Sequence, residues 1–264
     1  MTSVTQPRES ATRIALVYPE LLGTYGDGGN AMVLAQRLRW RGLPAQVVPV
    51  PAGSPLPEQC DIYLLGGGED EPQVLASAGL RDGQTLRRVT DGGAVVFAVC
   101  AGFQIVGHSF PGMDGRQHEG AGLLDVETRR SFAADGEPLP TRAVGDVVVE
   151  PDPALGLPPL LGYENHGGRT RPLPGAAGAP LGHVRAGIGN GTPDRAEGHV
   201  AGHVLATYLH GPVLAQNPAL ADLLLTWVHG ALPALDQQPE IERLRQVRLR
   251  ALDAAGAHRP GRSH

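Results

Sequence analysis

Cys100 is the residue whose surroundings best suit covalent chemistry. It follows the apolar run 94–99, which is short, rich in β-branched residues and preceded by a glycine pair. This pattern predicts a buried parallel strand with Cys100 at its carboxyl end. A helix predicted over 103–108 would begin close to the thiol, and its partial positive charge would stabilise a thiolate. Ala98 and Gly102 are small, as the neighbours of a nucleophile are in a tight strand-to-helix turn.

His210 is the residue that we expect to act as the base for this thiol, because a cysteine nucleophile needs a partner that takes its proton and returns it. His210 follows the apolar stretch 204–209 and precedes a glycine, so it is predicted to lie at a strand end as Cys100 does. His166 is the competing candidate. The alternatives are a surface histidine in a loop and a buried, inert cysteine, since free cysteines are usually buried.

Two glycine-rich loops follow predicted strands. Three glycines at 66–68 end the strand 61–65 and could aim backbone N–H groups at an oxyanion, or form only a flexible left-handed turn. The loop 23–30 follows the strand 13–18 and lacks the spacing of a dinucleotide-binding loop. We favour plain turn chemistry for this second loop over a phosphate cradle.

Strands and helices alternate in the first half of the chain, which predicts an α/β fold with a mostly parallel sheet. We expect a disordered lead over 1–12, one domain over 13–232, and a C-terminal helix with a flexible tail over 233–264. Within the last segment, the helix is predicted over 239–253 and the disordered tail from Ala254; the charge of this arginine-rich helix is typical of a solvated face. The other predicted helices are 31–41, 73–79, 86–91 and one that starts at 217, and the other predicted strands are 45–50, 123–128, 144–150, one near 160–163, and a pair over 198–209.

Composition excludes several classes of function. The chain has 264 residues and a net charge of −5, so no basic surface for nucleic acid is expected. It contains no lysine, which excludes a P-loop lysine and a Schiff base. Two cysteines make no disulfide framework, and neither a signal peptide nor a membrane-spanning run is found, so we expect a cytoplasmic protein. His199, His203 and His210 lack further ligands nearby, so no metal site is predicted.

Four motifs, in this order, resemble the cobyric-acid-synthase type of class I glutamine amidotransferases. The resemblance covers roughly residues 13–229, and within this group it is strongest to the GatD-type glutaminase subunits of lipid II isoglutaminyl synthases. No ATP-binding domain is found ahead of the motifs, and the first strand with its loop, as well as the Glu-Asn-His-Gly-Gly-Arg-Thr string, match those subunits. The motifs are the glycines 66–68, Cys-Ala-Gly-Phe-Gln at 100–104, the string within 162–170, and Tyr-Leu-His-Gly at 208–211.

The resemblance implies a class I amidotransferase sheet of the flavodoxin-like kind and a mechanism. Cys100 would attack the side-chain amide of L-glutamine to form a thioester, while His210 moves the proton. Backbone groups around Gly67 and Phe103 would hold the oxyanion. Ammonia would pass to a MurT-like Mur ligase subunit in a heterodimer, where ATP activates the D-glutamate of the lipid II stem peptide. The chain itself would need no cofactor.

The same resemblance places Gln104 in the substrate site and Arg142 on the substrate carboxylate, which suits the bidentate fork of arginine. Arg142 as a plain surface residue is the alternative. One departure concerns Pro212, since many class I amidotransferases have a glutamate two residues after the histidine. A Cys–His dyad is therefore expected, with no sequence feature that identifies what orients the ring. The alternative functions are service to another ligase such as a cobyrinic or cobyric acid synthase-like enzyme, a stand-alone cysteine hydrolase, and a non-catalytic binding module.

Overall fold

A six-stranded sheet forms the centre of the molecule in the computed structural model, which describes residues 10–82, 84–130, 142–235 and 239–257. The strand order is β13-β14-β4-β3-β1-β2, and every neighbouring pair is parallel except β13 with β14. The predicted mostly parallel α/β sheet is therefore confirmed. The strands are β1 (Thr12–Val17), β2 (Ala45–Val50), β3 (Ile62–Leu65), β4 (Val95–Val99), β13 (His199–Ala201) and β14 (Val204–Thr207).

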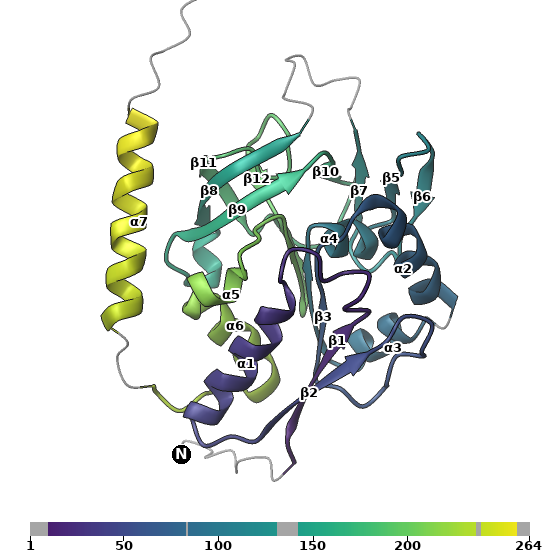
Figure 1. Ribbon diagram of the computed structural model, residues 1–264, viewed down its shortest axis with the longest axis horizontal. Coiled ribbons are helices and arrows are strands. Elements are labelled where there is room, and N and C mark those ends of the chain that lie inside the picture. The colour runs from purple at the N-terminus through teal and green to yellow at the C-terminus, as the bar shows by residue number, and fades with distance from the viewer. Residues whose placement is uncertain (1–9, 83, 131–141, 236–238, 258–264) are drawn as a thin grey trace, which may run out of the picture.

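The three central strands consist of apolar runs without alternation because helices cover both faces of the sheet. Every residue of β3, β4 and β14 is buried. In Figure 1, α1, α5 and α6 lie on one face of the sheet, and α2, α3 and α4 lie on the other. The helices are α1 (Gly28–Trp40), α2 (Asp70–Asp82), α3 (Thr85–Asp91), α4 (Ala101–Val106), α5 (Val213–Gln216), α6 (Pro218–His229) and α7 (Pro239–Ala257).

Two smaller four-stranded sheets lie beyond the carboxyl ends of the parallel strands (Figure 1). Their orders are β10-β7-β5-β6 and β12-β11-β8-β9. The first contains β5 (Ser109–Pro111), β6 (Gln117–Glu119), β7 (Val126–Arg129) and β10 (Arg169–Pro172). The second contains β8 (Ala143–Pro151), β9 (Leu160–His166), β11 (Gly182–Ala186) and β12 (Ala196–Glu197), and a short 3-10 turn, Pro153–Leu155, follows β8. Both sheets therefore stand around the edge at which parallel α/β sheets bind ligands.

Helix α4 differs from its predicted bounds. It begins at Ala101, directly after Cys100, and ends at Val106, because the chain turns at Gly107 into β5. The helix expected over 31–41 likewise begins earlier, at Gly28, since the last residues of the glycine-rich loop form its first turn. Both helices therefore start closer to the carboxyl edge of the sheet than the apolar spacing indicated.

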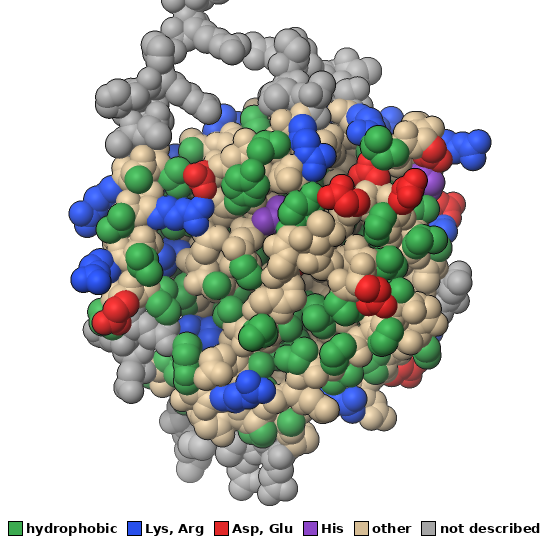
Figure 2. All heavy atoms as spheres, in the orientation of Figure 1, with side chains coloured by type: hydrophobic (Ala, Val, Ile, Leu, Met, Phe, Trp, Pro, Cys, Tyr) green, Lys and Arg blue, Asp and Glu red, His purple; other side chains and the backbone are tan. Residues whose placement is uncertain are grey.

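Helix α7 extends through Ala257, so the prediction of a disordered tail from Ala254 is wrong for the residues up to 257. Its Arg245 is almost fully buried and donates to the carbonyl of Pro159 at 2.7 Å and to Asn217 Oδ1 at 2.8 Å. Figure 2 shows basic side chains along the edge of the molecule where α7 runs. Residues 1–9 of the predicted lead over 1–12 and residues 258–264 of the predicted tail lie outside the described residues, and β1 begins at Thr12, inside the predicted lead. No helix of the described ranges is both long and apolar enough to span a membrane.

Candidate active site

Cys100 lies in a strained turn between β4 and α4. Its backbone has φ 53° and ψ −103°, a conformation that costs a non-glycine residue about 1–3 kcal/mol. Two hydrogen bonds hold the turn: Cys100 N–H donates to the Thr207 carbonyl at 2.9 Å, and Gly102 N–H donates to the Gly66 carbonyl at 3.1 Å. A Cβ atom at Gly102 would lie 2.6 Å from the Leu65 carbonyl oxygen, so only glycine fits there. The turn has the geometry of a nucleophile elbow.

His210 follows β14, the strand beside β4, and its ring is buried next to Cys100. Nδ1 lies 3.3 Å from Asp27 Oδ2, and the ring packs against Tyr25 with a centroid separation of 4.8 Å. Nε2 is buried and has no partner of regular hydrogen-bond geometry among the described residues. Burial lowers the pKa of His210, but the interactions with Asp27 and Cys100 outweigh it and raise the pKa to about 10. The structure thus brings the two predicted catalytic residues together, in a form that favours an imidazolium beside the sulfur.

Asp27 is the functional candidate that the sequence reasoning missed. It precedes α1 directly, is buried, and its Oδ2 also accepts a hydrogen bond from Gly67 N–H at 2.8 Å. A carboxylate here can orient the His210 ring, which is the task of the third member of a catalytic triad. The sequence feature that could have identified Asp27 is its position in the loop after the first strand, because this loop lies at the carboxyl edge shared by all the parallel strands.

The glycine-rich loop 23–30 thus supplies the Asp27 side chain to the site. Its last two residues, Gly29 and Asn30, make contacts within the protein. Asn30 Oδ1 accepts a hydrogen bond from Leu214 N–H at 3.0 Å, which ties α1 to α5. A Cβ atom at Gly29 would lie 2.5 Å from Pro212 Cγ. Pro212, at the position where many class I amidotransferases have a glutamate, therefore packs against α1. The His210 ring is in contact with Asp27 instead.

The glycines at 66–68 are required by close contacts within the protein. None of them has a positive φ, so the interpretation as a left-handed turn is wrong. A Cβ atom at Gly66 would lie 2.1 Å from a backbone oxygen of the loop after β1, and one at Gly68 would lie 2.4 Å from another. At Gly67 it would lie 2.6 Å from His210 Cε1. The three glycines let the loop that carries Asp27 and the ring of His210 approach the end of β3.

Two backbone N–H groups are candidate oxyanion donors beside the predicted pair at Gly67 and Phe103. The N–H of Gly67 is occupied by Asp27 in this arrangement. Phe103 is the third residue of α4, with its ring buried against Tyr208 at a centroid separation of 5.1 Å. The N–H groups of Gly68 and Ala101 donate to no other described residue. The residue after a nucleophile usually supplies one oxyanion donor and a neighbouring loop another, so we consider Ala101 and Gly68 as candidates for these two places.

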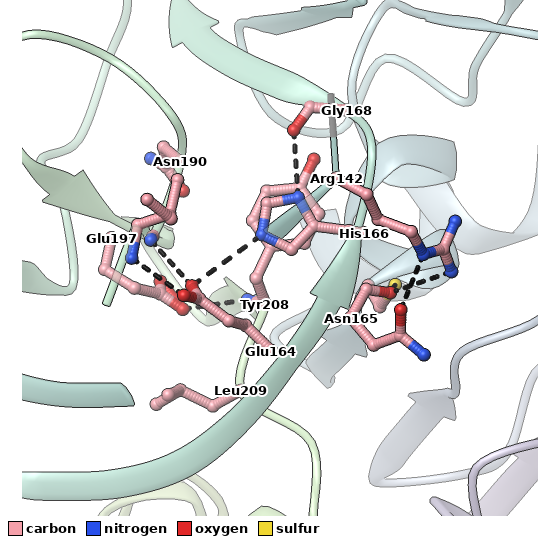
Figure 3. Close-up of polar contacts among 12 residues, drawn as sticks. Arg142, Glu164, Asn165, His166, Gly168, Asn190, Glu197, Tyr208 and Leu209 are labelled. Atoms are coloured by element: carbon pink, nitrogen blue, oxygen red, sulfur yellow. Dashed lines mark hydrogen bonds and ion pairs between the residues drawn. The ribbon is translucent and has the colours of Figure 1, made fainter. Parts of the chain in front are cut away.

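A cavity of about 80 Å³ opens beside Cys100, and the side chains of Gln104 and Arg142, which were predicted to bind the substrate, line it. Arg142 Nε donates to Asn165 Oδ1 at 2.6 Å, and the carbonyl of Asn165 lies 3.9 Å from the Cys100 sulfur (Figure 3). Gln104 is buried, and its Oε1 accepts a hydrogen bond from Gln73 at 3.0 Å. A guanidinium and an amide thus line the space that a small amino acid could occupy. The remaining lining residues are Tyr25, Gly68, Glu69, Asp70, Ala101, Pro111, Met113, Arg130, His166, Gly167 and Gly168.

His166 does not have the geometry of a catalytic base. Its Nδ1 is bonded to the Gly168 carbonyl at 2.9 Å, and its ring stacks on Tyr208 with a centroid separation of 3.7 Å (Figure 3). Burial lowers its pKa to about 4, so the ring stays neutral. Glu164 Oε2 lies 3.9 Å from Nε2, beyond hydrogen-bond distance. The structure therefore assigns His166 a packing role and favours His210 as the base.

Comparison with known proteins identifies the family of the chain. Residues 13–218 match the CobB/CobQ-like glutamine amidotransferase domain. The chain is 37% identical over 206 residues to the GatD subunit of lipid II isoglutaminyl synthase (glutamine-hydrolyzing) from Staphylococcus aureus, spanning 77% of this chain and 79% of that protein. It is 31% identical to the corresponding Streptococcus pneumoniae subunit, spanning 81% of this chain and 78% of that protein.

More distant similarities extend beyond these subunits. Cobyric acid synthase from Brucella anthropi is 31% identical over 213 residues, which span 74% of this chain and 40% of that protein. A crystal structure described as a glutamine amidotransferase superposes with a TM-score of 0.52 at 20% sequence identity, covering 82% of this chain and 98% of that one. At this identity the superposition supports the fold alone.

Proposed function

The chain belongs to the CobB/CobQ-like glutamine amidotransferases and is of the GatD type, and from this premise we propose that it hydrolyses L-glutamine to supply ammonia for the amidation of lipid II. The observation that carries the chemistry is the meeting of Cys100, in its strained turn, with His210 and Asp27. The same meeting disfavours a non-catalytic binding module, which would have no need of a buried base beside a thiol.

The first half-reaction transfers the acyl group of glutamine to the enzyme. Cys100 gives its proton to His210 Nε2, and the thiolate attacks the side-chain amide carbon. Gly68 and Ala101 N–H groups stabilise the negative oxygen that forms. His210 returns the proton to the leaving nitrogen, the carbon–nitrogen bond breaks, and ammonia departs. A γ-glutamyl thioester on Cys100 remains.

The second half-reaction releases glutamate. His210, again neutral, takes a proton from water as the water oxygen attacks the thioester carbon. The carbon–sulfur bond then breaks and the proton returns to the sulfur. Asp27 keeps Nδ1 as the donor throughout, so Nε2 always faces the reacting atoms, and its charge stabilises the imidazolium in both steps.

Arg142 is suited to bind the α-carboxylate of the substrate. It lines the cavity beside Cys100, and its guanidinium is held by Asn165, the residue whose carbonyl lies near the sulfur. A carboxylate on Arg142 would leave the side chain of glutamine to reach inward toward Cys100. Gln104 lines the same space and contributes polar contacts to the bound substrate.

The ammonia would be used by a second subunit. We propose a MurT-like Mur ligase in a cytoplasmic heterodimer, where ATP activates the α-carboxylate of D-glutamate in the lipid II stem peptide to give D-isoglutamine. The names and extents of the Staphylococcus and Streptococcus relatives support this assignment, because the similarity covers more than three quarters of each of those subunits. No cofactor is required on this chain for the glutamine chemistry described above.

Another ligase of the cobyric acid synthase kind is the second candidate recipient of the ammonia. It is favoured by the similarity to the Brucella enzymes, but this chain matches only 40% of the first of those proteins and at lower identity. The identity of the molecule that becomes amidated distinguishes between the two candidate ligases.

The test is glutamate release from L-glutamine by the purified chain, alone and co-purified with a Mur-ligase-like partner. We expect release that disappears in Cys100→Ala and increases with the partner, together with amidated lipid II when ATP is present. No release under either condition would refute the catalytic proposal. Release without lipid II amidation would refute the assigned acceptor alone.

A further inference from the structure

Glu197 is a fully buried carboxylate that the chemistry above does not use. It lies in β12, within the second small sheet, and has no exposed surface. None of its hydrogen bonds comes from a basic side chain among the described residues. Glutamates are almost never fully buried without a partner of opposite charge, because the charged form loses its hydration. Burial and the nearby charge of Glu164 accordingly raise the pKa of Glu197 to about 7.

The partners of Glu197 are the residues that immediately precede His210. Its Oε1 accepts hydrogen bonds from the Thr207 hydroxyl at 2.6 Å and from Tyr208 N–H at 2.8 Å. The Thr207 hydroxyl in turn accepts from Leu209 N–H at 3.1 Å. Figure 3 shows the carboxylate beside this stretch of chain, on the far side of Tyr208 from Arg142. One oxygen therefore holds three consecutive residues, directly or through one hydroxyl.

These residues lie in a gap between two regular pairings. The parallel ladder of β14 with β4 ends at Thr207, whose carbonyl accepts from Cys100 N–H. The next backbone pairing is at His210, which exchanges hydrogen bonds with Tyr163 of β9 at 2.8 and 3.3 Å. The N–H groups of Tyr208 and Leu209 fall between the main sheet and the second small sheet, and both donate to side chains. Glu197 accepts from Tyr208 N–H, and the Thr207 hydroxyl, itself bonded to Glu197, accepts from Leu209 N–H.

We propose that Glu197 is a positioning residue for His210, which fixes the backbone before the histidine so that the ring meets Cys100. The proposal rests on the proposed function only in taking His210 as the base. Asp27 orients the ring through its side chain, and Glu197 sets the place of the Cα atom from which that ring extends. Two carboxylates from distant parts of the chain then act on one histidine, without direct contact between Glu197 and the reacting atoms.

The variants follow from the acceptor role. Glu197→Ala removes the acceptor of both hydrogen bonds. Glu197→Gln keeps an oxygen that can accept both and removes the charge. Thr207→Val removes only the hydroxyl link to Leu209 and preserves the shape of the side chain. Glu150→Ala is the matched control, because Glu150 is an exposed glutamate that pairs with Arg185 away from the cavity.

The readout is the pH dependence of Cys100 alkylation by iodoacetamide, followed on the Cys100 peptide by mass spectrometry in the full chain. His210 is the proton acceptor beside the thiol in the proposed function, so a displaced His210 should slow alkylation of Cys100 at neutral pH. We expect Glu197→Ala to slow alkylation at pH 7 by about tenfold or more and Thr207→Val by about threefold. Glu197→Gln and the control should stay within about twofold of the wild type. Circular dichroism and melting curves establish that each variant is folded.

A folded Glu197→Ala protein with the wild-type curve would overturn the proposal, and so would equal losses in Glu197→Ala and Glu197→Gln. If Glu197→Ala does not fold, a wild-type curve in Thr207→Val overturns it instead. A wild-type chain with an ordinary, unactivated Cys100 or no glutamate release would contradict the proposed function itself. The two failures are therefore separable.

Discussion

Replacing Asp27 by asparagine tests the active site most directly. The amide oxygen of asparagine can still accept the hydrogen bond from Gly67 N–H, which is 2.8 Å long in the wild type. It can also accept from His210 Nδ1, 3.3 Å away, but the negative charge is lost. We therefore expect the Asp27→Asn protein to fold normally and to hydrolyse glutamine slowly.

The size of the effect follows from the pKa of His210. Interactions with Asp27 and Cys100 together raise it from 6.5 to about 10 against the effect of burial. One pKa unit corresponds to about 1.4 kcal/mol, so half of this increase is worth about 2 kcal/mol. Such a loss of imidazolium stabilisation lowers the rate about 30-fold. A fraction of molecules with the amide turned the wrong way would add to the loss, which gives an expected decrease in kcat of about 30- to 100-fold.

The assay is steady-state glutamate release with the Mur-ligase-like partner present, combined with the pH profile of Cys100 alkylation. KM should change little, because Asp27 does not line the cavity that holds Arg142 and Gln104. Asp152→Asn is the control, since Asp152 also accepts a backbone N–H, that of Ala154 at 2.8 Å, but has no contact with His210. Wild-type kcat and an unchanged alkylation profile in Asp27→Asn would refute the reasoning.

Further predictions concern other residues of the site. Cys100→Ala and His210→Ala should each abolish glutamate release while circular dichroism shows an intact fold; substantial turnover in Cys100→Ala would contradict the assignment of the nucleophile. Arg142→Ala should raise KM about tenfold or more, since a charge-assisted contact is worth about 1.5–3 kcal/mol, with Arg185→Ala as the surface control; an unchanged KM would leave Arg142 a plain surface residue. Gly67→Ala should reduce kcat at least about tenfold by displacing the His210 ring, whereas Gly28→Ala, whose Cβ meets nothing closer than 3.5 Å, should keep wild-type kinetics; equal activity in the two would contradict this packing argument. The pKa of His166 is about 4 in the folded state and 6.5 in the unfolded state, so the unfolded state binds the proton first. The free energy of unfolding therefore falls as the pH drops from 6.5 to about 4. Urea unfolding at pH 7 and 5 should show a loss about 2 kcal/mol larger in the wild type than in His166→Gln, and equal losses would contradict the buried neutral ring.

The sequence predicted the part of the site that depends on strand ends. Apolar runs of β-branched residues are good signals for buried parallel strands, and Cys100 follows β4 directly. His210 follows the apolar stretch 204–209, of which only Val204–Thr207 forms strand β14. Because neighbouring parallel strands share a carboxyl edge, the pair could be expected to meet. The role of Gly102 could also be predicted, because a tight strand-to-helix turn around a nucleophile requires small neighbouring residues.

The parts that could not be predicted depend on contacts between distant segments. Asp27 lies in a loop without periodicity, and nothing local shows that it faces a residue far along the chain. The sequence left two readings open for the glycines at 66–68, an oxyanion-binding loop and a flexible left-handed turn, but none of them has a positive φ and their small size serves contacts with the loop after β1. Glu197 gave no signal either, because its partners are fixed only when two sheets come together.

The pairing of Asp27 with His210 joins residues 183 positions apart, and this separation has a consequence during synthesis on the ribosome. Cys100 leaves the ribosome well before His210, so for much of translation the thiol has no base beside it. Only when β14 pairs with β4 does His210 come to lie beside Cys100. A chain that ends before β14 therefore lacks the base that the glutamine chemistry proposed above needs, so the site can be complete only when nearly the whole domain has been made.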